Sequence, residues 1–363
     1  MNISNDIKLD YDDVLICPKI TQLNSRSEVN LDVEFDFEYL TKGIPVCIAN
    51  MGTTGTFEMA KELSKYKIFT ALHKYYPLQK MMDFIIKEHN NQVLDYTWIT
   101  MGTSTKDYNK IIELYKTCNN AYICEEAISM FPKLLMIDIA NGYQKSFINF
   151  IKNIRRKLSI INSKLDNVVI CCGNVVTPDM ATELVEAGAN IIKVGLGSGA
   201  VCTTRLQSGV GYPQLSAIME CSEDIHNFGG LLMADGGIRT PGDAVKAFAA
   251  GADFVMAGSY FAGSDECEGK WVEDKNGEKH LIHYGMASKH AMEKYYVNLV
   301  DYRASEGKVV KVKAKGKVAD LMKEFLGGIR SACTYTNTVN LKNISNNINF
   351  IKVNHQINNL YEK

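Results

Sequence analysis

Residues 231–258 read LLMADGGIRTPGDAVKAFAAGADFVMAG, and this stretch decides the fold. It contains two apolar runs, Leu231–Gly236 and Phe254–Gly258, with a helix-like segment, Pro241–Ala250, between them. The proline that follows Thr240 suits the first position of a helix. Because the apolar runs are continuous rather than alternating, they predict strands that are buried on both faces, as in a parallel sheet. A strand, a helix and a strand in this order predict a right-handed βαβ unit.

The same alternation extends over most of the chain. Six further apolar, β-branched runs precede this unit, and they are Ile44–Asn50, Lys67–His73, Leu94–Met101, Leu134–Asn141, Val168–Val175 and Ile191–Gly197. Helical patterns follow them at Phe57–Tyr66, Pro77–Glu88, Tyr108–Thr117, Gln144–Lys157, Pro178–Ala187 and Pro213–Ile225. Eight strands that alternate with helices favour a closed (β/α)₈ TIM barrel of the α/β class over an open, doubly wound sheet.

We expect a single domain over residues 1–363. Residues 1–43 form an N-terminal extension, which we expect as a hairpin or plug across one end of the barrel. Residues 44–335 form the barrel with its active-site loops, and residues 336–363 form a peripheral tail. The polar segment 265–315 is an insertion after the eighth strand, with a turn at residues 275–277, Lys-Asn-Gly.

The composition is that of an ordinary soluble globular protein, with 46% hydrophobic and 22% charged residues. A net charge of -1 gives no general attraction to nucleic acid or to an acidic membrane. We find no apolar run near the roughly 18 residues that span a bilayer. The polar N-terminus is unlike a signal peptide, so we expect a cytoplasmic protein with reduced thiols. None of the ten cysteines forms a Cys-x-x-Cys pair, which argues against structural zinc.

Polar residues gather at the carboxyl ends of the predicted strands. They are Asn50, His73, Lys74, Asp138, Asn174, the loop Gly197–Arg205, Asp235, Gly236, Gly237, Gly258 and Ser259. In a TIM barrel these ends meet at one face, where the active site is built. Any one of these residues is equally well explained as an ordinary turn residue. The whole set predicts a functional face.

The segment 195–205 reads GLGSGAVCTTR and carries the sharpest chemical signal. Its three alternating glycines permit unusual backbone conformations, and their carbonyl oxygens suit a weakly hydrated cation such as K⁺. Cys202 lies beyond the glycines, beside Thr204 and Arg205. Nearby donors and positive charge stabilise a thiolate, so this position suits a nucleophile. A small buried cysteine in a glycine-rich turn is the alternative interpretation.

Two further segments suggest ligand contacts. Asp235–Gly237 and Gly258-Ser259 follow the last two strands, where backbone N–H groups of such barrels usually receive a phosphate. Asp235 then suits the ribose hydroxyls of a nucleotide, although two tight turns remain the alternative. In Tyr302–Gly307, Glu306 suits a general acid/base or a hydrogen-bond acceptor, or else belongs to a solvated loop.

Together these motifs resemble the IMP dehydrogenase/GMP reductase family over nearly the whole chain. The resemblance rests on the segments Gly195–Arg205, Gly209–Leu215, Asp235–Gly237 and Gly251–Met256. Within the family, Tyr302–Gly307, Leu326–Ser331 and Cys333–Tyr335 look like the reductase branch. We find neither the Arg-Tyr flap motif of the dehydrogenases nor an inserted pair of CBS domains.

The resemblance implies an NADPH-dependent conversion of GMP to IMP and ammonia, which serves purine salvage. Cys202 attacks C2 of the purine to give a covalent thioimidate, and Thr204 and Glu306 move protons. Hydride from NADPH then reduces C2. The resemblance also implies a homotetramer. The alternatives are the dehydrogenase reaction, IMP to XMP with NAD, and a purine-nucleotide-binding barrel without turnover.

The resemblance also implies the binding residues. Those for GMP are Asp235, Gly236, Gly237, Gly258, Ser259, Met286, Ala287, Ser288, Arg303, Ala304, Ser305, Glu306 and Gly307. Those for NADPH are Ser25, Arg26, Lys74, Asp138, Ile139, Ala140, Leu196, Gly197, Tyr302 and Arg303, with Ser331, Ala332, Cys333 and Thr334 expected from a neighbouring subunit. Those for K⁺ are Gly197, Gly199 and Cys202, with Arg205 near them. Arg26 and Lys74 suit the cofactor's 2′-phosphate.

Three departures from the family pattern affect binding rather than chemistry. Ala200 stands where serine is usual, and a lost hydrogen bond to a charged group costs about 1.5–3 kcal/mol. Gly52 and Thr54 stand where aspartate and valine are usual, and Lys294–Asp301 lacks a glycine pair. Cys202, Thr204 and Glu306 are all retained, so we expect the departures to alter substrate affinity and the response to K⁺.

Overall fold

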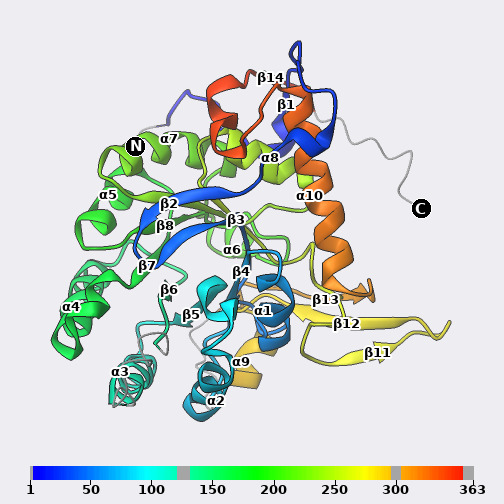
Figure 1. Ribbon diagram of the computed structural model, residues 1–363. Helices are drawn as coiled ribbons and strands as arrows, with labels where there is room; N and C mark the ends of the chain where they lie inside the picture. Colours follow the sequence, from blue (N-terminus) through cyan, green and yellow to red (C-terminus); the bar gives the residue numbers. More distant parts are fainter. Residues whose placement is uncertain (1–2, 121–130, 296–303, 355–363) are drawn as a thin grey trace.

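The computed structural model describes residues 3–120, 131–295 and 304–354, and its centre is a closed barrel of parallel strands (Figure 1). In order around the barrel the strands are β3 (Leu40–Ile48), β4 (Ile68–Leu72), β5 (Thr97–Met101), β6 (Leu134–Asp138), β7 (Val169–Val175), β8 (Ile191–Val194), β9 (Leu231–Asp235) and β10 (Phe254–Ala257). β10 pairs with β3, with Val255 opposite Val46, and this pairing closes the sheet. The predicted TIM barrel is therefore confirmed.

Helices cover the outside of the barrel where the sequence predicts them. They are α1 (Phe57–Ser64), α2 (Leu78–Glu88), α3 (Thr105–Asn120), α4 (Lys145–Ile161), α5 (Pro178–Glu186), α7 (Gln214–Asn227) and α8 (Pro241–Ala249). Local signals set their first turns. Thr240 and Asp243 form a reciprocal capping box at the start of α8, and Pro241 occupies the first helical position.

The barrel interior is filled by side chains from alternate strand positions. Its members include Cys47, Phe69, Trp98, Leu134, Met136, Cys171, Met233 and Phe254. The adjacent residues Cys171 and Cys172 point to opposite faces of β7, so that Cys171 lies inside the barrel and Cys172 packs under the helices. Burial raises the pKa of both thiols, which therefore stay protonated and unreactive.

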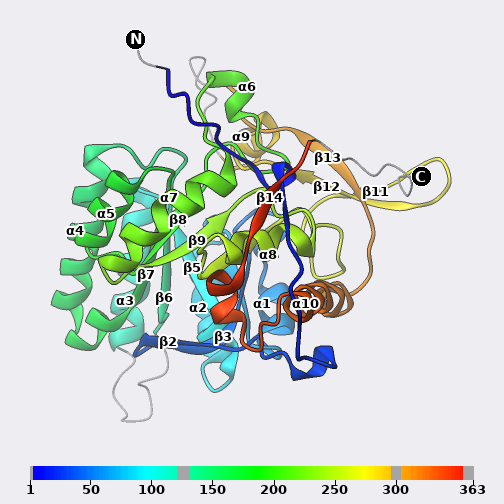
Figure 2. The same cartoon turned by 90° about the horizontal axis from the view of Figure 1, so that it is seen from above.

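The N-terminal extension plugs the barrel. β2 (Val33–Phe37) pairs antiparallel with the first half of β3, and the ring of Phe35 stacks on Phe254 of the interior at 4.7 Å. Figure 2 shows β2 at one end of the barrel and α6 (Thr204–Ser208) at the other. β2 therefore lies across one end of the barrel, and β3 begins at Leu40 rather than at Ile44 because its first residues pair with β2.

The insertion after β10 forms a small antiparallel sheet, β11 (Trp271–Glu273), β12 (Lys279–Tyr284) and β13 (Val309–Lys313), with α9 (Lys289–Tyr295) between β12 and β13 in the chain. The sequence analysis missed α10 (Val318–Tyr335), which packs against α8. Gly328 in the middle of α10 permits this contact, because a Cβ there would lie 2.5 Å from Pro241. Across the described ranges, none of the helices has the length and apolar character needed to cross a membrane.

The C-terminal segment belongs to the fold, and the expectation of a peripheral tail is wrong for residues 341–352. The 3₁₀ helix η6 (Leu341–Asn347) packs on α8, with Leu341 and Ile344 buried in the main core. β14 (Phe350–Lys352) pairs antiparallel with β1 (Val14–Ile16). Other short 3₁₀ turns are η1 (Tyr11–Asp13), η2 (Arg26–Glu28), η3 (Gln92–Tyr96) and η5 (Ser163–Asn167). Because η3 precedes β5, that strand starts later than the predicted Leu94.

The buried side chain of Ile344 predicts that the tail stabilises the barrel. Replacing Ile344 by Ala should lower the free energy of unfolding by about 2–5 kcal/mol, measured by urea denaturation, because it leaves a cavity against α8. The matched variant Ile351→Ala truncates a side chain that is 46% exposed and should cost well under half as much. Equal losses in the two variants would contradict a structural role for the tail.

Candidate active site

A pocket of about 490 Å³ opens at the carboxyl ends of the barrel strands. Several predicted strand-end residues line it, namely Asn50, Lys74, Asp138, Asn174, Gly197, Gly199, Cys202, Asp235 and Gly236. They come from different strands that converge at one rim because the strands are parallel. The predicted functional face is therefore a real concave site.

His73 is an exception among the strand-end residues. Its side chain is buried, its ring stacks on Tyr76 at 3.9 Å, and its Nδ1 accepts a hydrogen bond from the Tyr75 N–H. Burial lowers the pKa of His73 to about 4, so the imidazole is neutral at physiological pH. His73 supports the β4 end from below and does not line the pocket.

Cys202 is the first member of a hydrogen-bonded chain inside the pocket. Its Sγ lies 3.3 Å from Oγ1 of Thr204, and this hydroxyl donates to Oε2 of Glu306 at 2.7 Å. All three side chains are partly buried, and all three residues line the pocket. A thiol, a hydroxyl and a carboxylate in this sequence can pass a proton between a nucleophile and a general acid/base.

Backbone pairing brings Glu306 from far along the chain to Cys202. The Thr203 N–H donates to the Glu306 carbonyl at 3.0 Å, and the Lys308 N–H donates to Val201 at 3.0 Å. Gly285 lies beside this pairing, where a Cβ would be only 2.7 Å from the Val201 carbonyl. The Cys202 loop (residues 197–205), the Glu306 segment and the loop after β12 therefore form one packed unit.

A buried charge network forms the floor of the pocket. Lys193 of β8 is 1% exposed, and its Nζ contacts Asp138 at 2.5 Å and Asp235 at 2.9 Å. Asn174 donates to the same Asp235 oxygen at 2.9 Å. Burial lowers the pKa of Lys193, but the two carboxylates outweigh it and leave the pKa raised. Burial likewise raises the pKa of Asp138, but Lys193 outweighs it and leaves that pKa lowered. Both groups are therefore charged at neutral pH.

Arg205 links the Cys202 loop to the N-terminal segment. Nη1 of Arg205 lies 2.9 Å from Oδ2 of Asp10, and Nη2 donates to the Tyr212 carbonyl. The other Asp10 oxygen accepts the N–H of Gln214 at the start of α7. The side chain of Arg205 also fills the space beside Gly197, where a Cβ would lie 2.5 Å from its Cγ. Because Arg205 follows Thr204 directly in α6, these contacts also fix the position of Thr204 and, through it, of Cys202.

The residues predicted for GMP divide into two groups. Asp235, Gly236, Met286, Ala287 and Glu306 line the pocket. The remaining described members lie around it without lining it, and they are Gly237, Gly258, Ser259, Ser288, Ala304, Ser305 and Gly307. Arg303 lies outside the described residues. Ser288 and Gly307 form a bridge, so this outer group supports the pocket wall.

The residues predicted for NADPH also fall into two groups, one that lines the pocket and one that does not. Lys74, Asp138, Ile139, Ala140, Leu196 and Gly197 line the pocket. Arg26 begins η2, Ser25 caps it, and η2 lies beside α10. The last turns of α10 carry Ser331, Ala332, Cys333 and Thr334, and none of these six residues lines the pocket. Tyr302 lies outside the described residues. The second group therefore lies apart from the pocket, and one of its members, Cys333, is buried in the main core.

Several pocket residues escaped the sequence analysis. Lys193 is the clearest case, and its signal was a lone charge inside the apolar run 191–194. Tyr75, Met51 and the stretch Gly102–Ser104 at the start of α3 also line the pocket. Tyr75 gave a signal by following Lys74 directly. Met51 and Gly102 carry no chemistry that marks them in sequence.

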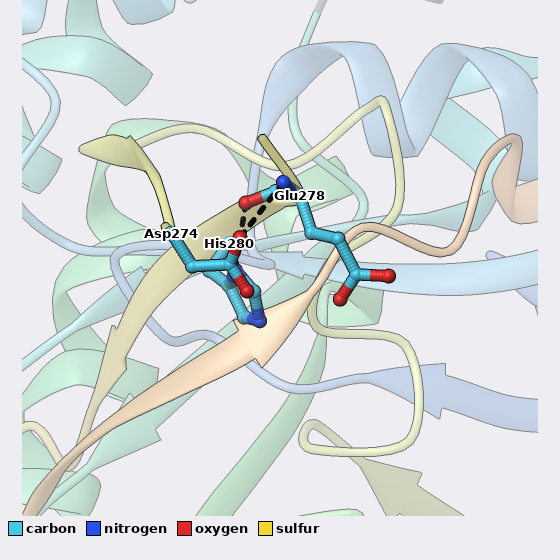
Figure 3. A group of neighbouring side chains, drawn as sticks. All are labelled: Asp274, Glu278 and His280. Atoms are coloured by element: carbon cyan, nitrogen blue, oxygen red, sulfur yellow. Dashed lines mark hydrogen bonds between the residues drawn. The ribbon is translucent and has the colours of Figure 1, made fainter. Parts of the chain in front are cut away.

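One cluster of possible metal ligands lies among the described residues, far from the pocket at the tip of the β11–β12 hairpin (Figure 3). It consists of Asp274, Glu278 and His280. Each member is already engaged, because Asp274 accepts two backbone N–H groups, Glu278 pairs with Lys313, and His280 Nδ1 contacts the Glu278 carbonyl. These contacts account for the cluster as a hairpin turn without a metal.

Comparison with known proteins bears on the whole chain. The family model for the IMP dehydrogenase / GMP reductase domain matches residues 8–359. The chain belongs to the IMP dehydrogenase/GMP reductase family. A protein named GMP reductase from Yersinia pestis (strain Pestoides F) is 43% identical over 364 residues, which cover 99% of both chains. A protein of the same name from Yersinia pseudotuberculosis serotype O:1b (strain IP 31758) gives the same values. The resemblance inferred from the motifs is thus confirmed at the level of the IMP dehydrogenase/GMP reductase family.

The buried lysine predicts a distinctive pH dependence of stability. Lys193→Met should lower the free energy of unfolding at pH 7 by about 3–5 kcal/mol, because it leaves two carboxylates uncompensated. In the wild type the lowered pKa of Asp138 makes stability fall as the pH drops through that pKa. The raised pKa of Lys193 preserves its contribution until the pH rises above the ordinary lysine range.

In Lys193→Met, burial without a partner raises the carboxyl pKa, so the gap between variant and wild type should narrow toward pH 4. Urea denaturation at both pH values measures this gap. The control Lys133→Met breaks the more exposed pair with Asp95 and should cost under about 1 kcal/mol at either pH. A gap that widens in acid would contradict the network.

The contact between Asp10 and Arg205 predicts an effect on Cys202 from outside the pocket. Asp10→Asn keeps the size of the side chain but weakens its bond to Arg205, so the relay should lose its fixed orientation. We expect the rate at which iodoacetamide modifies Cys202 to differ from that of wild type by about three-fold or more. Mass spectrometry of the Cys202 peptide measures this rate. Asp12→Asn is the control, because Asp12 pairs with Arg239 away from the loop. Equal rates in both variants would refute the link.

Proposed function

We propose that this protein is a GMP reductase, which converts GMP to IMP and ammonia with NADPH. The observation that carries the proposal is the chain from Cys202 through Thr204 to Glu306, with distances of 3.3 and 2.7 Å, at the rim of a nucleotide-sized pocket. Membership of the family and the 43% identity to proteins named GMP reductase support the same activity.

The chemistry follows from the order of the three side chains. The Cys202 thiolate forms a bond to C2 of GMP, and the bond from C2 to the amino group breaks. Glu306 and Thr204 deliver the proton with which ammonia leaves, and a covalent thioimidate remains. When hydride reaches C2, the bond to sulfur breaks, and Cys202 is released as IMP forms. Covalent catalysis divides a difficult displacement at an aromatic carbon into two easier steps.

The charge network suits the nucleotide. Asp235 faces the pocket with one oxygen held by Lys193 and Asn174, which orients its carboxylate for ribose hydroxyls. Ser198 and the backbone of Gly236 lie together, since a Cβ at Gly236 would overlap the Ser198 hydroxyl. This hydroxyl and the nearby N–H groups are suited to a phosphate, and Ser198 offers a hydroxyl near the one that Ala200 lacks.

The rest of the pocket suits NADPH, which supplies the hydride when it is bound. Lys74 and the Gly102–Ser104 backbone at the start of α3 offer a cation and N–H groups for its phosphates. Asp138 and Ala140 also line this pocket. The pocket is too small to enclose the whole dinucleotide beside GMP, so we infer that the η2 and α10 cluster binds its far end across a subunit contact. A homotetramer supplies such contacts.

Two further expectations accompany the proposal. We infer that the carbonyl oxygens of Gly197, Gly199 and Cys202 hold K⁺. The guanidinium of Arg205 is excluded from the ligand set, because it is a cation bound to Asp10 and the Tyr212 carbonyl. We also infer that the enzyme works in the cytoplasm, where its thiols remain reduced. Light scattering of the purified protein tests the tetramer, and activity with and without KCl tests the cation.

The decisive test uses purified protein with GMP and NADPH. We expect NADPH oxidation with release of ammonia, and a purine adduct on Cys202 in acid-quenched enzyme by mass spectrometry. Cys202→Ser should lower kcat by roughly a thousand-fold or more and remove the adduct, and Glu306→Gln should lower kcat by about 10²–10⁴. Cys17→Ser, which alters another partly exposed thiol, is the control.

Two results would overturn the proposal. Reduction of NAD⁺ with IMP, and no oxidation of NADPH with GMP, would assign the dehydrogenase reaction instead. Tight GMP binding without turnover or adduct would assign a binding protein.

A further inference from the structure

Gly52 is a point of close contact between the barrel and the insertion. A side chain at this position would overlap the hydroxyl of Tyr295, and its Cβ would lie 3.0 Å from the Tyr284 hydroxyl. The Gly52 N–H also points toward Sδ of Met286 at 3.2 Å. Because residue 52 has no side chain, two tyrosine hydroxyls and the sulfur of Met286 can lie close to the loop after β3.

Tyr295 connects this contact with a second wall of the pocket. Its ring stacks on that of Tyr75 with centroids 3.8 Å apart and planes within 11°. Its hydroxyl lies 3.1 Å from that of Tyr284, to which Lys294 also donates at 3.1 Å. Tyr75 and Met286 both line the pocket, whereas Tyr295 does not.

We infer that Tyr295 is a positioning residue that fixes Tyr75 by its ring stack and fixes the Gly52 loop, whose N–H contacts Met286, and thereby sets the affinity of the pocket for its ligands. The end of α9 is locked to the loops after β3 and β4 by a ring stack and by a hydroxyl that fits over Gly52. The lock takes no part in proton transfer, because it touches none of Cys202, Thr204 and Glu306. The inference rests on the proposed function for the identity of the ligands.

The fit of Tyr295 over Gly52 makes a size-exchange experiment possible. Gly52→Ala places a methyl group on the Tyr295 hydroxyl and should displace α9, raising KM for GMP and for NADPH about three- to ten-fold. The fall in kcat should be smaller than the rise in KM. Tyr295→Phe removes the overlapping hydroxyl, so the double variant Gly52→Ala/Tyr295→Phe should recover most of the lost affinity. A second route, Tyr295→Leu, removes the stack on Tyr75 and should raise both KM values.

Matched controls separate this lock from general effects of substitution. Gly327→Ala adds a methyl group in α10 where no atom lies within 4 Å, and Tyr66→Phe removes a hydroxyl from a side chain that is 46% exposed. Both should leave KM and kcat at wild-type values. Thermal unfolding of each variant shows whether it is folded. If Gly52→Ala does not fold, Tyr295→Leu tests the positioning role instead, because its rise in KM should exceed its fall in kcat.

Failure of the inference is distinguishable from failure of the proposed function. If wild-type protein does not turn over GMP with NADPH, the function is wrong, and GMP protection of Cys202 against iodoacetamide then replaces KM as the measure of binding. If wild type is active but Gly52→Ala and Tyr295→Leu bind GMP and NADPH as wild type does, the positioning role is wrong. A double variant no better than Gly52→Ala would also overturn the fit between Tyr295 and residue 52.

Discussion

Closure of the sheet between β10 and β3 is the constraint on which the rest of the molecule depends. Parallel strands in a closed barrel have all their carboxyl ends on one rim, so residues that are distant in the chain become neighbours there. Cys202, in the loop after β8, and Asp235, at the end of β9, line one pocket in this way. Glu306 does not follow a barrel strand. It lies at the same rim because the insertion after β10 pairs with the backbone of the Cys202 loop. The hydrogen-bonded position of Cys202 therefore depends on both the closure of the sheet and the insertion.

The fold also has to place charge where the barrel is most tightly packed. Lys193 points into the interior from β8, and two carboxylates pair with it, Asp235 from the adjacent strand β9 and Asp138 from β6, which lies beyond β7. A buried ion pair of this kind contributes little net stability, since desolvation offsets the attraction. Its value lies in geometry. It holds both carboxylates, Asp138 and Asp235, in the lining of a single pocket.

Much of this structure was predictable from the sequence, and the reasons are physical. The eight strands are continuous apolar runs because they are buried on both faces, and proline and capping residues mark several helix starts. The α10 helix was missed because Gly327 and Gly328 interrupt its pattern, although Gly328 serves the contact with Pro241. The Asp10 link and the fit of Tyr295 over Gly52 join residues from distant parts of the chain. No local pattern encodes such pairs, so only the fold could show them.

The position of β2 across one end of the barrel limits how small molecules can reach the pocket. With Phe35 seated on Phe254 and the interior filled by side chains, the barrel is not a tunnel, and the described residues leave only the carboxyl-end rim as a way to the thiol. Every molecule that reacts at the thiol must then enter and leave through this one opening. A molecule bound in this opening also shields from solvent whatever lies deeper in the pocket.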